Sequence, residues 1–266
     1  GIQHRVFPAE RWIRFKYDLP LKKSSLLKRI NLLRNFIVKN SIDLVYTNTA
    51  VICEGALAAA LEQKTHIWHI HEYLFEHPEL KPIFPIDYTL KVIMKLSDKV
   101  ICASDYVKSQ FPELKEGPFE NVLTTIYNGI NDYKINVSVL SETKTHKENE
   151  NISIVCVGLL SKTKDYETFL KTAKYCIHRN SQLTFSWIGG GELNDIEHFL
   201  KFVKENQLDG KVNYLGYRNN TRDLIFESDI LICTSLMETF SLSILEAMSG
   251  SKPVVSTNCG GPSEII

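Results

Sequence analysis

Residues 228–264 follow an order of strand, loop, helix, strand and glycine-rich turn, and this order constrains the fold more than any other feature of the chain. An apolar strand at 228–233 leads into a loop and a short helix at 239–248, and a second strand at 252–257 precedes Gly260 and Gly261. Strands that are joined by a helix pair in parallel, because the connection crosses back over the sheet. The segment therefore predicts a parallel α/β unit whose strand ends face one crevice.

Two glutamates, Glu238 and Glu246, lie before and inside this helix with seven residues between them. Backbone N–H groups at 239–242 lie at the helix N-terminus and suit a phosphate or diphosphate. Carboxylates that accept hydrogen bonds from hydroxyl groups suit a sugar or a ribose. The alternative is structural: Ser243 and Glu246 form a capping box, and Glu238 is a solvated loop residue.

Strands and helices alternate through the rest of the chain as well. Further strands are predicted at 42–47, 66–71, 99–103, 152–158, 183–188 and 212–215, and further helices at 19–40, 52–61, 105–111, 194–207 and 218–226. This alternation predicts doubly wound parallel sheets. Residues 137–151 are polar and charged and predict an interdomain linker, so that the domains are expected at 1–136 and 152–266.

Composition narrows the class of protein. The 266 residues carry no net charge, which argues against a nucleic-acid partner. No apolar run is long enough for a transmembrane helix, and no secretory signal is visible. The six cysteines show no C-x-x-C pair and are expected to be reduced thiols rather than a disulfide or zinc framework. A cytoplasmic protein is predicted.

The segment with both glutamates resembles the family 4 nucleotide-sugar glycosyltransferases, which are retaining enzymes with the GT-B fold of two Rossmann-like domains. In that family the first glutamate contacts the transferred sugar and the second binds the ribose hydroxyls, which implies these roles for Glu238 and Glu246. In place of the family's Gly-Phe-Gly-Leu this chain has Thr239-Phe240-Ser241-Leu242. The resemblance implies that the backbone N–H groups of this loop contact the diphosphate. We expect the loop to accommodate Ser241 in place of glycine if its φ is negative.

The start of the second domain carries further matches to the family. Gly158 ends a strand where the family has Gly-Arg-Leu followed by a lysine, and the arginine and lysine clamp the diphosphate. Lys164 matches that lysine, whereas Leu159 stands in the place of the arginine. Loss of a bidentate cation weakens phosphate binding unless another cation substitutes for it, and Lys162 is the nearest candidate.

Glycines and a third glutamate complete the predicted donor site. Gly189 and Gly191 follow the strand at 183–188, as in the family's turn beside the nucleotide. The dinucleotide fingerprint of dehydrogenases is incomplete, because no third glycine follows at the required spacing. Glu264 matches a family glutamate near the site. Weaker matches at Ser104 and at 126–131 are explained as well by a helix N-cap and an Asn-Gly turn.

His69 and His71 lie at strand spacing and are expected on one face, with His66 and Glu72 near. His/His/Glu can bind zinc, although the family needs no metal in its donor site. At the carboxyl end of a strand, His71 could hydrogen-bond the donor or accept the proton of the acceptor, and a structural role stays open. Many relatives carry a histidine at the end of the preceding strand, where this chain has Tyr46-Thr47-Asn48. The sequence therefore leaves the identity of the proton acceptor open.

The resemblance implies a hexosyltransferase that uses a nucleoside diphosphate sugar as donor and needs no separate cofactor or metal. The nucleoside diphosphate of this donor is expected to be UDP or GDP. The implied acceptor is a hydroxyl, in some relatives of a lipid-linked saccharide, in surface polysaccharide or glycolipid assembly. Two alternatives to a glycosyltransferase stay open. One is a non-catalytic glycosyltransferase-like binding protein, which Leu159 suggests, and the other is a sugar-nucleotide epimerase of the same fold.

The basic helix at 19–40 predicts either packing on a sheet or peripheral contact with the inner face of the plasma membrane. Relatives begin with a further strand and continue past the last glycine-rich turn, so both ends of the chain are expected to be incomplete.

Overall fold

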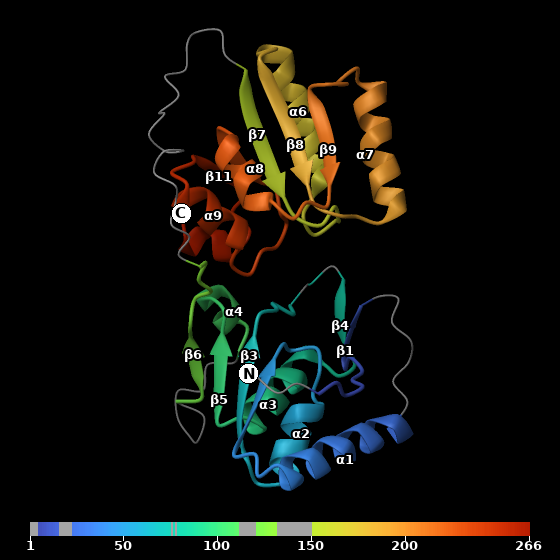
Figure 1. Ribbon diagram of the computed structural model, residues 1–266, viewed down its shortest axis with the longest axis vertical. Coiled ribbons are helices and arrows are strands. Elements are labelled where there is room, and N and C mark those ends of the chain that lie inside the picture. The colour runs from blue at the N-terminus through green and yellow to red at the C-terminus, as the bar shows by residue number, and fades with distance from the viewer. Residues whose placement is uncertain (1–4, 16–22, 76, 78, 112–120, 132–150) are drawn as a thin grey trace. The chain divides into compact units, whose positions relative to one another are not determined.

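The computed structural model describes residues 5–15, 23–75, 77, 79–111, 121–131 and 151–266 (Figure 1). The chain divides into two compact units, Gly1–Tyr127 and Asn128–Ile266. The predicted linker lies outside the described residues except for Asn151. Within the described ranges, no helix combines the length and apolar character needed to cross a bilayer.

The N-terminal unit contains a parallel sheet in which the strands follow chain order: β2 (Leu44–Asn48), β3 (Thr65–Ile70), β5 (Lys99–Cys102) and β6 (Leu123–Thr125). A separate antiparallel pair joins β1 (Ile13–Phe15) to β4 (Leu80–Pro82). The three longest strands were predicted. The others were not, because three residues are too few to establish a periodic pattern.

Four described helices accompany these strands: α1 (Lys23–Lys39), α2 (Glu54–Leu61), α3 (Ile86–Lys95) and α4 (Asp105–Ser109). Ile30 and Ile37 of α1 pack with Ala58 of α2, so the predicted basic helix is a packed helix over its described residues. The predicted N-cap of α4 is confirmed, since Ser104 Oγ accepts a hydrogen bond of 3.0 Å from Val107 N.

The described part of the C-terminal unit contains five parallel strands: β7 (Ile152–Val157), β8 (Leu183–Ile188), β9 (Val212–Gly216), β10 (Ile230–Cys233) and β11 (Val254–Ser256). Their order in the sheet is β11-β10-β7-β8-β9. The chain starts at the central strand β7, adds strands on one side as far as β9 and then returns to add β10 and β11 on the other. This is the doubly wound order that was predicted, and its direction reverses between β7 and β10.

Helices cover both faces of this sheet: α6 (Tyr166–Arg179) and α7 (Leu193–Glu205) lie on one, and α8 (Thr221–Glu227) and α9 (Leu242–Ser249) on the other. Ile154 and Cys156 of β7 pack towards the first pair and Val155 towards the second. Burial on both faces explains the continuous apolar run of β7. Helix α6 was not predicted, although Phe169, Leu170 and Ala173 recur at helical spacing in its sequence and are buried.

Candidate functional site

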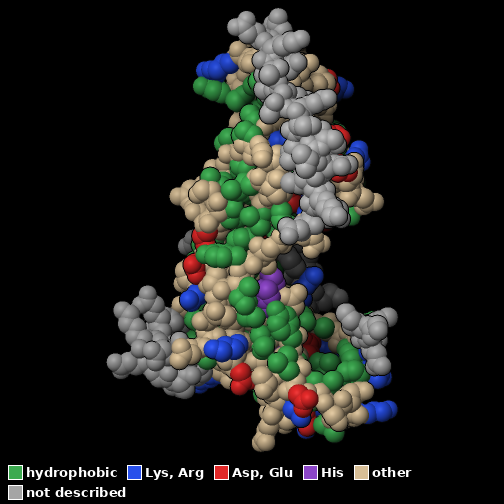
Figure 2. All heavy atoms as spheres, turned by 60° about the vertical axis from the view of Figure 1, so that its left-hand side comes forward, with side chains coloured by type: hydrophobic (Ala, Val, Ile, Leu, Met, Phe, Trp, Pro, Cys, Tyr) green, Lys and Arg blue, Asp and Glu red, His purple; other side chains and the backbone are tan. Residues whose placement is uncertain are grey.

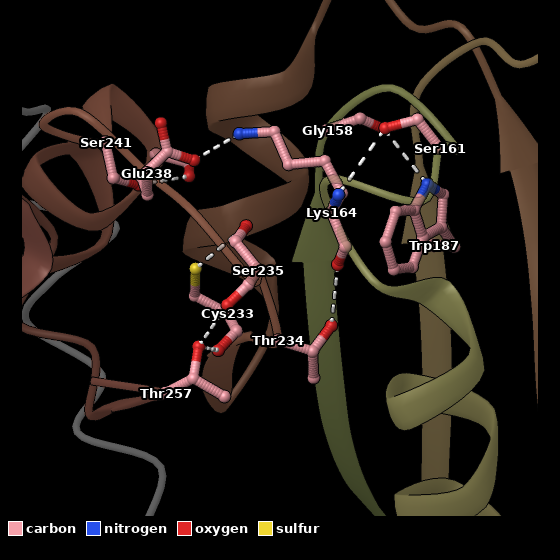
Figure 3. A network of polar contacts seen from close by, with 11 residues as sticks. Gly158, Ser161, Lys164, Trp187, Cys233, Thr234, Ser235, Glu238, Ser241 and Thr257 are labelled. Carbon is pink, nitrogen blue, oxygen red and sulfur yellow. Dashed lines mark hydrogen bonds and ion pairs between the residues drawn. The ribbon is translucent and has the colours of Figure 1, made fainter. Parts of the chain in front are cut away.

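Two predicted site residues that are far apart in sequence meet at the point where the strand order reverses. Lys164 lies in the loop after β7, and Glu238 lies in the loop after β10. The Nζ atom of Lys164 forms an ion pair with Oε2 of Glu238 (Figure 3). The two side chains are 27% and 14% exposed, so the pair is partly shielded from water but open to a ligand.

Hydrogen bonds between the two loops hold Lys164 in place. Thr234, at the end of β10, donates its hydroxyl to the carbonyl oxygen of Lys164 at 3.1 Å (Figure 3). Leu236 N donates to Thr163 O at 2.9 Å. Burial by itself disfavours the ammonium ion, but the Glu238 carboxylate outweighs this effect and holds the pKa of Lys164 above its ordinary value. Lys164 therefore presents a positive charge at neutral pH.

The backbone of Glu238 is fixed by the glycine-rich turn after β11. Glu238 N donates to Cys259 O at 3.0 Å, and Gly261 N donates to Glu238 O at 2.8 Å. A Cβ atom at Gly261 would lie 2.2 Å from Thr239 O, so a side chain at this position would displace the loop. Glu264, the third predicted glutamate, is an exposed residue of the short 3₁₀ helix η1 (Gly261–Glu264) that follows.

The loop before α9 differs in two respects from what the sequence suggested. Ser241 is the N-cap of α9 and has φ +82°, so the negative φ on which the accommodation of serine depended is not found. A residue other than glycine in such a conformation costs about 1–3 kcal/mol. The capping-box alternative is also wrong, because Ser243 lies inside the helix and no side chain caps its N-terminus. Phe240 is buried and Leu242 is exposed.

Glu246 lies on α9 and is paired with a residue that the sequence did not single out. Its Oε1 atom accepts a bond of 3.2 Å from Nη2 of Arg222 on α8. Both side chains are about one-fifth exposed, at 23% and 21%. Since α8 and α9 lie side by side only in the folded unit, no sequence spacing could have identified Arg222.

The predicted glycines bring the loops after β7 and β8 into contact. Gly189 has φ +146°, and a Cβ atom there would lie 2.0 Å from Gly158 O. A Cβ atom at Gly158 would lie 3.3 Å from the side chain of Lys164, and one at Gly191 would lie 2.8 Å from Leu160 Cβ. These glycines therefore permit the backbone approach that leaves room for Lys164.

Leu159 and Lys162 follow β7 in the same loop as Lys164, and both are exposed. Leu159 is 57% exposed, so the position of the family arginine presents an apolar side chain to solvent. That Lys162 supplies the phosphate contact of the missing arginine stays a prediction.

In the N-terminal unit, His71 lies just after β3 and its Nε2 atom is 2.8 Å from Asn48 Oδ1 at the end of β2. His69 Nδ1 is 2.7 Å from the Tyr46 hydroxyl. The two imidazole rings are 4.1 Å apart, which confirms that they share one face. Figure 2 shows histidine side chains at the surface of this unit, bordered by hydrophobic side chains.

His66 and Glu72 have structural partners. His66 Nδ1 lies 2.9 Å from the carbonyl oxygen of Leu96, which makes it the donor and leaves Nε2 to accept from Thr47 Oγ1 at 2.8 Å. Burial lowers the pKa of His66, so the ring is neutral at neutral pH.

Glu72 accepts hydrogen bonds from the hydroxyl of Thr49 and from Ala50 N, the latter at 2.9 Å, and so anchors the loop after β2. The described residues contain no group of three potential metal-ligating side chains. His71 is the candidate site residue of this unit, and all the others lie in the C-terminal unit.

Comparisons with known proteins cover most of the chain. The sequence model described as Glycosyltransferase Family 4 matches residues 4–134, and the model described as Glycosyl transferases group 1 matches residues 151–266. The chain is 28% identical over 250 residues to an uncharacterised glycosyltransferase of Methanocaldococcus jannaschii, covering 91% of this chain and 64% of that protein.

A second relative is the UDP-Gal:α-D-GlcNAc-diphosphoundecaprenol α-1,3-galactosyltransferase of Escherichia coli, with 27% identity over 248 residues, 88% of this chain and 62% of that protein. The chain thus spans less than two thirds of each relative. Among solved structures, Anabaena HepE in complex with UDP and glucose has a TM-score of 0.71 and 22% identity, covering 93% of this chain and 68% of that one. This likeness shows the fold.

Proposed function

Because the chain belongs to the family 4 glycosyltransferases and has their GT-B fold, we propose that it moves a sugar from a nucleoside diphosphate sugar to a hydroxyl acceptor, with retention at the anomeric carbon. One observation carries the donor half of the proposal: Lys164 and Glu238 meet at the reversal point of a doubly wound sheet. Open α/β sheets bind nucleotides outside the carboxyl ends of their strands at this point.

Each candidate side chain has a proposed role. Lys164, together with the backbone N–H groups at 240–242, stabilises the charge that develops on the departing diphosphate. Glu238 accepts hydrogen bonds from hydroxyls of the transferred sugar, and Glu246 accepts them from the ribose. The Arg222 guanidinium holds the Glu246 carboxylate in position for the ribose.

The names of relatives suggest which substrates to test first. HepE was crystallised with UDP, and the name of the Escherichia coli relative gives UDP-galactose as donor and a saccharide on diphosphoundecaprenol as acceptor. We therefore favour UDP over GDP, and a lipid-linked saccharide as the acceptor in polysaccharide or glycolipid assembly. His71, at the carboxyl end of β3, is proposed to hydrogen-bond a sugar hydroxyl.

Calorimetric titration with UDP, GDP and ADP tests the donor site. One nucleotide should bind saturably, and both Lys164→Met and Glu246→Gln should weaken it at least tenfold, because each removes a charged partner of the ligand. Lys171→Met and Glu205→Gln are matched controls, since these side chains form exposed pairs on α6 and α7. Unchanged binding by the two site variants would refute the assignment.

The exposed Leu159 favours a second candidate, a glycosyltransferase-like protein that binds a nucleotide sugar without transferring it. Product analysis with the preferred nucleotide sugar and a lipid-linked acceptor separates the cases. A glycosylated acceptor indicates transfer, an epimerised nucleotide sugar indicates an epimerase, and binding without a product indicates a binding protein. Leu159→Arg should tighten nucleotide binding if the position still faces the diphosphate.

A further inference from the structure

Three large apolar side chains are exposed together where α3 begins. Ile83, Phe84 and Tyr88 are 44%, 48% and 55% exposed. The rings of Phe84 and Tyr88 lie edge to face with centroids 5.6 Å apart, so the two side chains form one continuous surface. Single exposed apolar residues are ordinary, whereas a cluster within six residues marks an interaction site.

The surrounding structure holds this surface rigidly. Ile83 N donates to Trp12 O at 3.2 Å directly after β4, which is paired with β1. The inner face of α3 is fully buried through Leu90, Ile93 and Met94. The aromatic side chains therefore stay exposed on an ordered element, and their exposure is not caused by a loose loop.

Basic residues accompany the apolar cluster. Lys91 and Lys95 follow Tyr88 at helical spacing on the outer face of α3, and Lys81 of β4 is exposed before it. The segment from β4 to the end of α3 contains a single carboxylate, that of Asp87. Aromatic and aliphatic side chains beside an excess of lysine are complementary to the headgroups and acyl boundary of an anionic bilayer.

We infer that Ile83, Phe84 and Tyr88, with Lys81, Lys91 and Lys95, dock the N-terminal unit on an anionic phospholipid surface. The packed helix α1 provides a less suitable surface. Its exposed Leu27 and Leu32 are about 140° apart around the helix, with Lys28 and Asn31 between them, and its exposed Val38 lies about 16 Å along the helix axis from Leu27.

The position of this docking surface relates it to the candidate site in the same unit. A crossover helix runs antiparallel to the strands that it connects, so the N-terminal end of α3 lies at the carboxyl edge of the sheet. His71 follows β3 at this edge. Docking would bring a lipid-linked acceptor to the edge that carries His71, and this consequence rests on the proposed function, whereas lipid binding itself does not.

Sedimentation with vesicles tests the inference. The chain should bind vesicles of phosphatidylglycerol and phosphatidylcholine, bind pure phosphatidylcholine at least tenfold more weakly, and lose binding as salt is raised. Phe84→Ser with Tyr88→Ser should weaken binding at least tenfold. Lys91→Glu with Lys95→Glu should weaken it more than twentyfold, since each lysine contributes roughly fivefold at an anionic surface.

The matched control is Leu32→Ser with Lys28→Glu, which removes one exposed apolar and one basic side chain from α1. Binding that survives the α3 substitutions, or that falls equally in the control, would overturn the inference. A change of oligomeric state in the Phe84/Tyr88 variant without a change in vesicle binding would assign the surface to a second copy of the chain instead.

Nucleotide titration of the same variants keeps the two proposals separate. The α3 variants should bind nucleotide like the parent chain, because the donor site lies in the other unit. Nucleotide binding without vesicle binding would contradict only the docking surface, and the reverse result would contradict only the donor site.

Discussion

At the scale of single residues, the ion pair between Lys164 and Glu238 has a consequence for ligand binding. Without a ligand, each side chain is the counterion of the other. A diphosphate that binds Lys164 must compete with the Glu238 carboxylate for the same ammonium group. The pair thus protects the charge of Lys164 and at the same time opposes the anionic part of the donor.

Glu238→Gln should therefore have opposite effects on binding and transfer. Affinity for the free nucleoside diphosphate should rise about fivefold, since a partly exposed ion pair contributes about 1 kcal/mol. Transfer should fall at least a hundredfold, because the variant loses the charged acceptor for sugar hydroxyls. Calorimetry and a single-turnover transfer assay measure the two effects. Weaker binding of the diphosphate would show that Glu238 does not compete with it.

Ser241 makes a second prediction at this scale. Its φ of +82° is a conformation that glycine adopts more easily than serine. Ser241→Gly should raise the free energy of unfolding by about 1 kcal/mol, or the melting temperature by about 2–4 °C. Ser243→Gly, two residues on and inside α9, is the control and should lower stability. A lower melting temperature for Ser241→Gly would contradict strain at this position.

At the scale of elements, a buried ion pair joins α1 to α2. Arg29 Nε lies 2.8 Å from Glu54 Oε1, and the side chains are only 6% and 2% exposed. Glu54 also accepts a bond of 3.0 Å from Glu10 N, so the pair ties the segment before α1 to both helices. The sequence predicted a basic helix at 19–40, but it did not show that Arg29, one of the basic residues of α1, is buried.

Glu54→Ala should lower the free energy of unfolding of the N-terminal unit by about 3 kcal/mol, because it removes the buried carboxylate partner of Arg29 and leaves only the more exposed Glu10, whose Oε2 lies 3.3 Å from Arg29 Nη2. Glu62→Ala is the matched control. Glu62 forms an ion pair with Arg34 of α1, and the two side chains are 19% and 39% exposed. This more exposed pair should contribute about 1 kcal/mol or less to the free energy of unfolding. Urea unfolding followed by tryptophan fluorescence measures both, and equal losses would disprove the distinction.

At the scale of the whole molecule, all six cysteines are free thiols and five of them are buried. In the N-terminal unit, burial raises the pKa of Cys53 and of Cys102 to about 12, from 9.0. A raised pKa means that the folded unit keeps these thiols protonated while the unfolded chain ionises them. Their contribution to stability is complete below pH 9 and is lost as the pH rises towards 12.

Between pH 9 and pH 12, each thiol should lower the free energy of unfolding by roughly 1.4 kcal/mol per pH unit. Urea unfolding at pH 8 and pH 10 should show this loss in the parent chain and a smaller one in Cys53→Ala with Cys102→Ala. Cys176→Ala, which removes a thiol at a partly exposed position, is the control for the loss of a cysteine side chain. The explanation fails if the double variant loses as much stability between pH 8 and pH 10 as the parent chain does.

The sequence by itself determined the fold class, most of the strands and the identity of the candidate donor residues. Strand β8 and the doubly wound order of the C-terminal unit follow from apolar runs separated by helices and glycine turns, which are local patterns. Strands β1 and β6 are too short to leave such a pattern. The linker prediction for 137–151 lies outside the described residues except for Asn151.

Only the tertiary structure decided which of these side chains meet. Lys164 reaches Glu238, and Glu246 reaches Arg222, because β10 lies beside β7 and α8 beside α9. The positive φ of Ser241 likewise belongs to the folded loop and not to the local sequence. A local pattern records the period of a strand or helix, but not its neighbours in the sheet. Those neighbours depend on contacts between residues far apart in the chain, and these contacts form the site.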